Sequence, residues 1–178
     1  RTAAAELDAA PRPSPGTLPL YGVPLAFKDN IDVAGMPTTA GSPWMADHRP
    51  RIHAGVTQRL LDAGALVLGK TNLHEWSQGV TGHNHGFGPS RNPFDAARIT
   101  GGSSGGNAAL LGLHAAPAAI GTDTGGSVRV PAALCGLVGL RPTVGRVSGR
   151  GIAPISTTRD TAGPIARSRP RIRHGHPH

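Results

Sequence analysis

The sequence ITGGSSGGNAALLGLHAAPAAIGTDTGGSVRVP, at residues 99–131, decides how the rest of the chain is interpreted. It carries two glycine–serine clusters, GGSSGG at 101–106 and TGGS at 124–127, with an apolar segment at 108–120 between them. Glycine allows the backbone to turn tightly and to approach another group closely. Paired glycine turns that expose a hydroxyl therefore predict a functional site. A flexible glycine–serine linker would not enclose an apolar run of this length.

The composition predicts a single domain outside the membrane. The chain has 178 residues, 38% of them hydrophobic, which is enough for one core. It contains no apolar run of about 18 residues, so we expect no transmembrane helix. The one cysteine, Cys135, lies in an apolar segment and is expected in the core. A single cysteine forms no internal disulfide, which fits a reducing compartment and predicts a cytoplasmic protein.

The positive net charge does not indicate a nucleic-acid-binding protein. The formal net charge is +8, but four arginines fall within the last twelve residues, at positions 167, 169, 171 and 173. When these four are taken from the 18 basic residues, 14 remain against 10 acidic ones. The remaining basic residues are scattered and lack the interleaved aromatic residues of a single-strand platform. We therefore expect no nucleic-acid partner.

Short apolar segments alternate with helical patterns along the chain, which predicts an α/β layered fold. Val23, Leu25 and Phe27 alternate with other residues and predict a strand that ends at Lys28. Thr71 is expected to cap a short helix that runs through Trp76. Residues 160–168, DTAGPIARS, are expected to form a loop. The other expected elements are a buried strand at 65–68, a strand at 117–122 and helices within 53–63, 107–114 and near 130–137.

Ser127 is the first candidate nucleophile. A serine hydroxyl needs a base to accept its proton and donors to hold the oxyanion that develops. Ser127 follows Gly125 and Gly126, and consecutive amides of this kind next to a helix start form an anion-binding nest. Taken alone, this turn fits a plain Gly-Gly turn equally well.

Other site motifs match less well. GGSSG at 101–105 satisfies the G-x-S-x-G pattern of a nucleophile elbow, but FDAARIT before it has little strand character. Asp123-Thr124-Gly125 lacks the Ser or Thr that follows in an aspartic protease, and GGSSGG lacks the Gly-Lys-Ser/Thr ending of a P-loop. The histidines and Cys135 have no zinc spacing, so we expect no metal.

Four stretches, in this order, resemble the amidase signature family: GVPLAFKDNIDVAGMPTTAGS at 22–42, DAGALVLGKTNLHEWSQG at 62–79, FGPSRNPFDAARITGGSSGGNAA at 87–109 and GTDTGGSVRVPAALCGLVGLRPTVGRVS at 121–148. The resemblance implies the N-terminal part of an α/β/α sandwich with a central mixed sheet and no cofactor. It predicts a flexible lead-in or helix end at 1–19, a partial amidase signature domain at 20–168 and a basic non-family tail at 169–178. We interpret the chain as a truncated product and its tail as the result of a shifted reading frame.

The resemblance implies a Ser–cis-Ser–Lys triad of Ser127, Ser103 and Lys28, with a cis peptide before Ser103 and an acyl-enzyme intermediate. Lys28 acts as a base only when neutral, and burial away from carboxylates lowers the pKa of a lysine. Asp29 is adjacent, but neighbouring side chains on a strand face opposite ways. Lys70 is assigned no catalytic role.

The resemblance also implies residues that support this triad. The expected oxyanion hole consists of the backbone amides of Thr124, Gly125, Gly126 and Ser127. The supporting residues are expected to be Ser104, Asp123 and Arg129, although simple solvation on a helix surface is an alternative for Arg129.

Residues 151–168, GIAPISTTRDTAGPIARS, are similar to the indoleacetamide and mandelamide hydrolase branch of the family. This similarity implies a small carboxamide substrate, an aryl- or alkyl-acetamide, cleaved to a carboxylate and ammonia. Two alternatives stay open: an inactive truncated fragment, and the A-type subunit of a tRNA-dependent amidotransferase, which needs a partner subunit. For a longer form of the protein we expect a homodimer.

Overall fold

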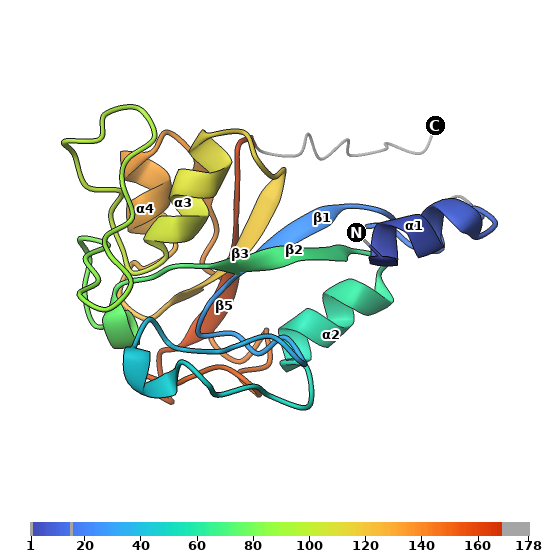
Figure 1. The fold of residues 1–178 in the computed structure, drawn as a ribbon, viewed down its shortest axis with the longest axis horizontal. Helices are drawn as coiled ribbons and strands as arrows, with labels where there is room; N and C mark the ends of the chain where they lie inside the picture. The colour runs from blue at the N-terminus through green and yellow to red at the C-terminus, as the bar shows by residue number, and fades with distance from the viewer. Residues whose placement is uncertain (1, 15, 169–178) are drawn as a thin grey trace.

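A five-stranded mixed sheet organises the chain in the computed structural model, which describes residues 2–14 and 16–168 (Figure 1). The strand order is β2-β1-β3-β5-β4. Strand β1 pairs in parallel with both β2 and β3, whereas β5 pairs antiparallel with β3 and β4. The predicted α/β fold with a mixed sheet is therefore confirmed. The strands are β1 (Pro24–Lys28), β2 (Leu66–Thr71), β3 (Ala118–Asp123), β4 (Val138–Gly139) and β5 (Thr161–Ala166).

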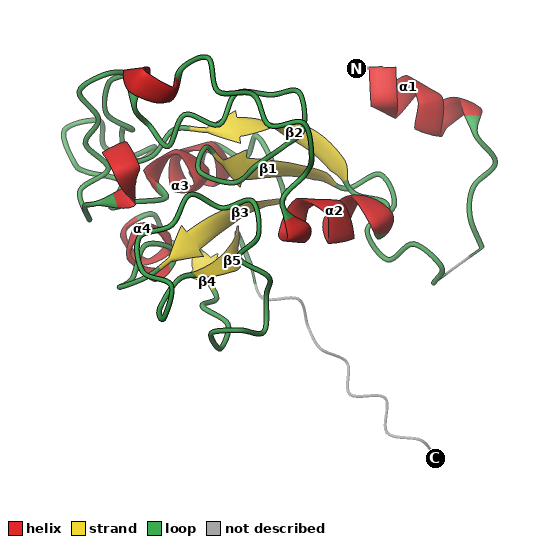
Figure 2. Ribbon diagram, turned by 90° about the horizontal axis from the view of Figure 1, so that it is seen from below, coloured by secondary structure: helices red, strands yellow, loops and turns green. Residues whose placement is uncertain are grey.

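Helices cover both faces of this sheet (Figure 2). On one face Leu25 and Phe27 of β1 pack with Val56 and Leu60 of helix α2. On the other face Ala26 belongs to the cluster that contains apolar residues of α3 and α4. Successive side chains of β1 thus pack against helices on opposite faces of the sheet, as the alternation of side chains along a strand requires. The helices are α1 (Thr2–Ala9), α2 (Gly55–Asp62), α3 (Gly105–Gly112) and α4 (Arg129–Leu134), with 3₁₀ turns at Pro43–Met45 and Glu75–Ser77.

Most predicted elements are present within a few residues of their expected bounds. The strand that ends at Lys28, the helix α2 with Gly64 after its last turn, and the strand β3 all lie where the sequence pattern placed them. Helices α3 and α4 begin one or two residues earlier than expected. The lead-in contains the helix α1, and the expected tail at 169–178 lies outside the described residues.

The loop predicted for residues 160–168 is wrong. Six of these residues form β5, which lies between β3 and β4. The segment TAGPIA has small residues and a proline in place of an apolar alternation, so its pattern did not indicate a strand. The segment becomes a strand through a tertiary contact, because all six of its residues pair antiparallel with β3. Ile165 is completely buried in the cluster beneath α3 and α4.

The predicted helix cap at Thr71 is also wrong. Thr71 is the last residue of β2, and its hydroxyl donates to the side-chain carbonyl of Asn107 in α3. The 3₁₀ turn begins four residues later, at Glu75, after His74, which provides no side-chain cap. The strand β2 is less buried than expected, since Leu68 is 49% exposed. A hydroxyl suited to a helix cap is used here to join the sheet to α3.

We expect Ile165→Ala to lower the free energy of unfolding by about 2–5 kcal/mol, because it removes a fully buried side chain from β5. Urea denaturation followed by circular dichroism measures this change. Ile52→Ala is the matched control, since Ile52 is 63% exposed and the same truncation there should cost less than about 0.5 kcal/mol. Equal losses in the two variants would contradict the burial of β5.

Candidate active site

Two parallel strands and two helix starts bring the predicted site residues to one end of the sheet (Figure 1). Lys28 is the last residue of β1, and Thr122 and Asp123 end the neighbouring strand β3. The carboxyl ends of parallel strands lie at the same edge, where open α/β sheets bind their ligands. Ser103 precedes α3, and Ser127 lies between β3 and α4.

Lys28 is a completely buried lysine whose amine contacts two hydroxyls. Its Nζ donates to Ser103 Oγ at 2.7 Å and to Thr122 Oγ1 at 2.8 Å. Burial lowers the pKa of Lys28 to about 7, against the opposing negative charges of Asp123 and Asp160. Near neutral pH, roughly half of the molecules therefore carry an uncharged amine at this position. Such an amine can accept a proton.

Ser103 is held in an enclosed turn. The Gly102–Ser103 peptide bond is cis, and the hydroxyl of Ser103 is completely buried. The carbonyl of Ser103 accepts a hydrogen bond from the backbone of His74 at 3.0 Å. A Cβ at Gly102 would lie 2.7 Å from the backbone nitrogen of Gly82, so this close approach of two chains requires glycine. The turn therefore presents its hydroxyl to Lys28 from a fixed backbone.

Ser127 is fixed through its backbone. The amide of Ser104 donates to the carbonyl of Ser127 at 3.2 Å, which joins the two glycine–serine clusters. The Ser104 hydroxyl donates to the carbonyl of Thr122 at 3.4 Å. Within residues 2–14 and 16–168 no hydrogen bond joins the side chains of Ser103 and Ser127. Ser127 is 7% exposed, whereas Ser103 and Lys28 are enclosed. The structure thus pairs the side chains of Lys28 and Ser103 and joins the backbone of Ser127 to that of Ser104, the residue after Ser103.

The carboxylate of Asp123 organises the turn that contains Ser127. It accepts hydrogen bonds from the backbone of Gly126 at 2.8 Å and of Val128 at 3.2 Å, and from Arg129 Nε at 3.0 Å. Arg141 Nε lies 3.2 Å from the same carboxylate. The Asp123 carboxylate therefore holds the turn together, and the Arg129 side chain is bound to it. The amide of Gly126, one of four expected oxyanion donors, is bound to this carboxylate.

Hydrogen bonding controls the ionisation of Asp123. Burial alone would raise its pKa, but the hydrogen bonds from Arg129 and from the amides of Val128 and Gly126 together hold the pKa below its usual value. The same pairing raises the pKa of Arg129. At neutral pH the ionised carboxylate thus binds the backbone amides of Gly126, Val128 and Arg129 and holds the turn together.

Sequence reasoning missed three polar residues of this region. Asn30 Nδ2 donates to Thr122 Oγ1 at 3.0 Å, so Thr122 accepts from both Asn30 and Lys28. Asp160 accepts from the hydroxyl of Thr124 at 2.5 Å and from the backbone of Ile155 at 2.7 Å. Asn30 lies two residues after Lys28 and could have been suspected from that spacing. No sequence pattern indicated that Thr122 and Asp160 belong to this region, because they are brought together by the pairing of β3 with β5.

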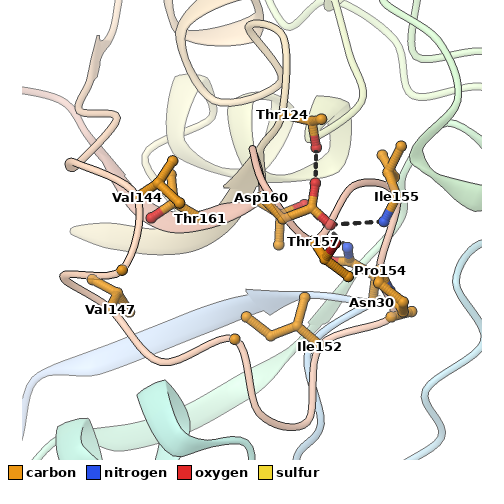
Figure 3. Close-up of a pocket in the computed structure, with 14 residues that line it drawn as sticks. Asn30, Thr124, Val144, Val147, Ile152, Pro154, Ile155, Thr157, Asp160 and Thr161 are labelled. Carbon is orange, nitrogen blue, oxygen red and sulfur yellow. Dashed lines mark hydrogen bonds between the residues drawn. The ribbon is translucent and has the colours of Figure 1, made fainter.

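A cavity of about 290 Å³ adjoins these polar residues (Figure 3). Thr124 and Asp160 lie along one side of it, and Asn30 lies on another. The remaining labelled side chains are mostly apolar and belong to the loop before β5: Val144, Val147, Ile152, Pro154 and Ile155. The cavity therefore combines an apolar wall with hydroxyl, amide and carboxylate groups that are already engaged with one another.

No group of three or more His, Cys, Asp or Glu side chains in the described residues is arranged to hold a metal ion. Among those residues, too, no helix has the length and apolar character needed to cross a membrane.

The family model described as Amidase matches residues 1–171. The chain is 54% identical over 156 residues to the mandelamide hydrolase of Pseudomonas putida, covering 85% of this chain and 31% of the relative. It is 50% identical over 167 residues to the A-type subunit of the glutamyl-tRNA(Gln) amidotransferase of Acidothermus cellulolyticus, covering 94% of this chain and 33% of the relative. The solved structure of native peptide amidase from Stenotrophomonas maltophilia is similar with a TM-score of 0.88 and 48% identity, covering 94% of this chain and 35% of that one. The chain thus spans about a third of the length of the proteins it matches.

We expect Asp123→Asn to lower the free energy of unfolding at pH 7 by about 3 kcal/mol, since it leaves Arg129 and Arg141 beside an uncharged group. The folded-state pKa of Asp123 is depressed, so its contribution to stability is present above the unfolded value of about 3.9 and is lost as pH falls through the folded value. Unfolding measured from pH 7 to pH 2.5 should therefore show a smaller loss for the variant than for the wild type.

Asp95→Asn is the control for this measurement, because Asp95 pairs with Arg98 on the surface. It should change stability by less than about 1 kcal/mol. Parallel pH profiles for wild type and Asp123→Asn would contradict the role given to Asp123.

Proposed function

The chain belongs to the amidase family, and on that premise we propose that the protein hydrolyses a carboxamide, with Ser127 as nucleophile, Ser103 as proton relay and Lys28 as base. The observation that carries this proposal is the hydrogen bond between the buried amine of Lys28 and the hydroxyl of Ser103. A lysine whose pKa is about 7 is matched to proton transfer at neutral pH, whereas an ordinary lysine is almost entirely protonated there.

The proposed reaction has two stages. The proton of Ser127 passes to Ser103 as Ser127 Oγ attacks the carbonyl carbon, and the proton of Ser103 passes to the neutral amine of Lys28. The C–N bond then breaks, and the leaving nitrogen takes a proton back from Lys28 through Ser103 and departs as ammonia. Water next attacks the carbonyl of the resulting ester, which releases the carboxylic acid and restores Ser127.

Backbone amides are proposed to hold the oxyanion. Because the amide of Gly126 donates to Asp123, the proposal relies on those of Thr124, Gly125 and Ser127. The Asp123 carboxylate holds this turn at Gly126 and Val128. Preorganised donors of this kind cost no reorganisation as charge develops. Ser104 and Arg129 take supporting roles, through the carbonyl of Ser127 and through Asp123 respectively.

A small aryl- or alkyl-acetamide is the proposed substrate class. The similarity to mandelamide hydrolase, at 54% identity, supports an arylacetic amide. The similarity to the A-type amidotransferase chain, at 50% identity, supports a second candidate, in which the protein releases ammonia from an amide donor within a larger assembly. Ammonia release from mandelamide and from glutamine, each assayed without other subunits, separates the two. Turnover of glutamine alone would favour the amidotransferase alternative.

Ser127→Ala should abolish covalent labelling by a fluorophosphonate, because the probe requires an activated serine hydroxyl. Intact-protein mass spectrometry measures one adduct on the wild type and none on the variant. Ser148→Ala is the matched control and should label as the wild type does, since Ser148 is exposed in a loop and its hydroxyl oxygen accepts from the backbone of Arg150. An adduct that persists in Ser127→Ala would move the nucleophile to another residue. An unreactive wild type would instead support the inactive-fragment alternative.

The rate of this labelling should rise with pH through about 7 and level off above it, because the base is the uncharged form of Lys28. Replacing the amine in Lys28→Met should reduce the rate at least a hundredfold and remove the dependence. The second-order rate constant at pH values from 5.5 to 9 measures both effects. A flat wild-type profile over this range would count against Lys28 as the base.

A further inference from the structure

A second buried lysine lies close to Lys28 in the sheet. Lys70 belongs to β2, where it pairs with Phe27, and the next pair along the ladder is Thr71 with Lys28. The backbone nitrogen of Asp29 donates to the carbonyl of Thr71 at 3.0 Å. The two strands therefore place Lys70 and Asp29 on either side of the ladder step that contains Lys28.

Lys70 and Asp29 form an enclosed ion pair. Lys70 Nζ lies 2.7 Å from Asp29 Oδ1, and the two side chains are only 9% and 14% exposed. The amine also donates to the carbonyl of Pro37 at 2.9 Å and to the hydroxyl of Thr38 at 3.1 Å. The other oxygen of Asp29 accepts from the backbone and hydroxyl of Thr39. Both oxygens of the Asp29 carboxylate are thus bound by residues other than Lys28.

This pair matters for Lys28 because the adjacent residue carries a negative charge. The Cα atoms of neighbouring residues are about 3.8 Å apart, so an unpaired carboxylate at position 29 would favour the charged form of Lys28 across a poorly solvated interior. The cation of Lys70, whose Nζ lies 2.7 Å from Asp29 Oδ1, would offset the negative charge of that carboxylate. The charges of Asp123 at the end of β3 and of Asp160 before β5 raise the pKa of Lys28, and Lys28 in turn lowers the pKa of His74 after β2.

We propose that Lys70 is a positioning residue, which binds Asp29 so that the amine of Lys28 stays uncharged and able to accept a proton from Ser103. The consequence for activity rests on the proposed function, but the electrostatic effect is a property of the chain itself. Burial lowers the pKa of Lys70 too, while its hydrogen bond to Asp29 and the charge of Asp29 oppose this. The two amines therefore have different partners: Lys70 contacts a carboxylate, and Lys28 contacts hydroxyls but no carboxylate.

The sequence makes a direct test available, because lysine occurs only at positions 28 and 70. A chain labelled with ¹³C at lysine Cε gives two resonances, which Lys28→Met and Lys70→Met assign. Their chemical shifts against pH report the midpoint of each amine without substrate or activity. In the wild type we expect Lys28 to titrate near 7.

Lys70→Met should raise the Lys28 midpoint by about one pH unit, a tenfold loss of the neutral fraction, because Asp29 is left without its cation. Asp29→Asn should lower the Lys28 midpoint, because the charge of Lys70 is then unopposed. The double variant Asp29→Asn/Lys70→Met should return it to within about 0.3 unit of the wild type. A role confined to folding would give losses of stability with no opposite shifts of this midpoint.

Lys70→Arg, which keeps the charge, is the matched control and should leave the Lys28 midpoint unchanged. The proposal is overturned if Lys70→Met leaves that midpoint within about 0.3 unit of the wild type, or if the double variant keeps the shift of Lys70→Met. Should Lys70→Met fail to fold, Asp29→Asn decides: a lower midpoint supports the proposal, and an unchanged or higher one overturns it. A chain whose Ser127 is unreactive but whose midpoints shift as expected would overturn the proposed function and leave this inference standing.

Discussion

The burial of one amine constrains the rest of this structure. Lys28 has no exposed surface and bonds to two hydroxyls rather than to a carboxylate. A charged ammonium in such a place is costly, and this cost brings its pKa to about 7. The surroundings must then supply hydrogen bonds to the amine while keeping negative charge away from it. Both requirements are met by residues that come from different strands.

The sheet and the glycine turns meet these requirements together. Strands β1 and β3 run in parallel, so Lys28 and Thr122 lie at the same edge, and the turn before α3 adds Ser103. Two carboxylates raise the pKa of Lys28, those of Asp123 and Asp160. Asp123 is bound by Arg129, and Asp160 accepts hydrogen bonds from the hydroxyl of Thr124 and the backbone of Ile155. Asp29 is occupied by Lys70. The carboxylates of Asp29, Asp123 and Asp160 are therefore each bound by groups other than Lys28, and the pKa of Lys28 stays near 7 although Asp123 and Asp160 raise it.

Local patterns predicted the parts of the fold that local residues determine. The alternation before Lys28 and the glycine clusters placed β1, α3 and the turn at Ser127 correctly. The strand β5 escaped prediction because TAGPIA acquires its conformation from pairing with β3, and Thr71 was misassigned because its hydroxyl bonds to α3. The same limit applies to the site. Lys70 looked like an ordinary strand lysine, since its ion pair with Asp29 depends on the pairing of β1 with β2.

The central claim, that the amine of Lys28 has a pKa near 7, is most directly tested by the ¹⁵N chemical shift of its Nζ in the wild-type chain labelled at lysine. Ammonium and amine nitrogens resonate in distinct ranges, and only two lysines contribute. At pH 8 the Lys28 nitrogen should resonate mainly as an amine, about one unit above its pKa. An ammonium resonance for Lys28 that persists through about pH 9.5 would contradict the account.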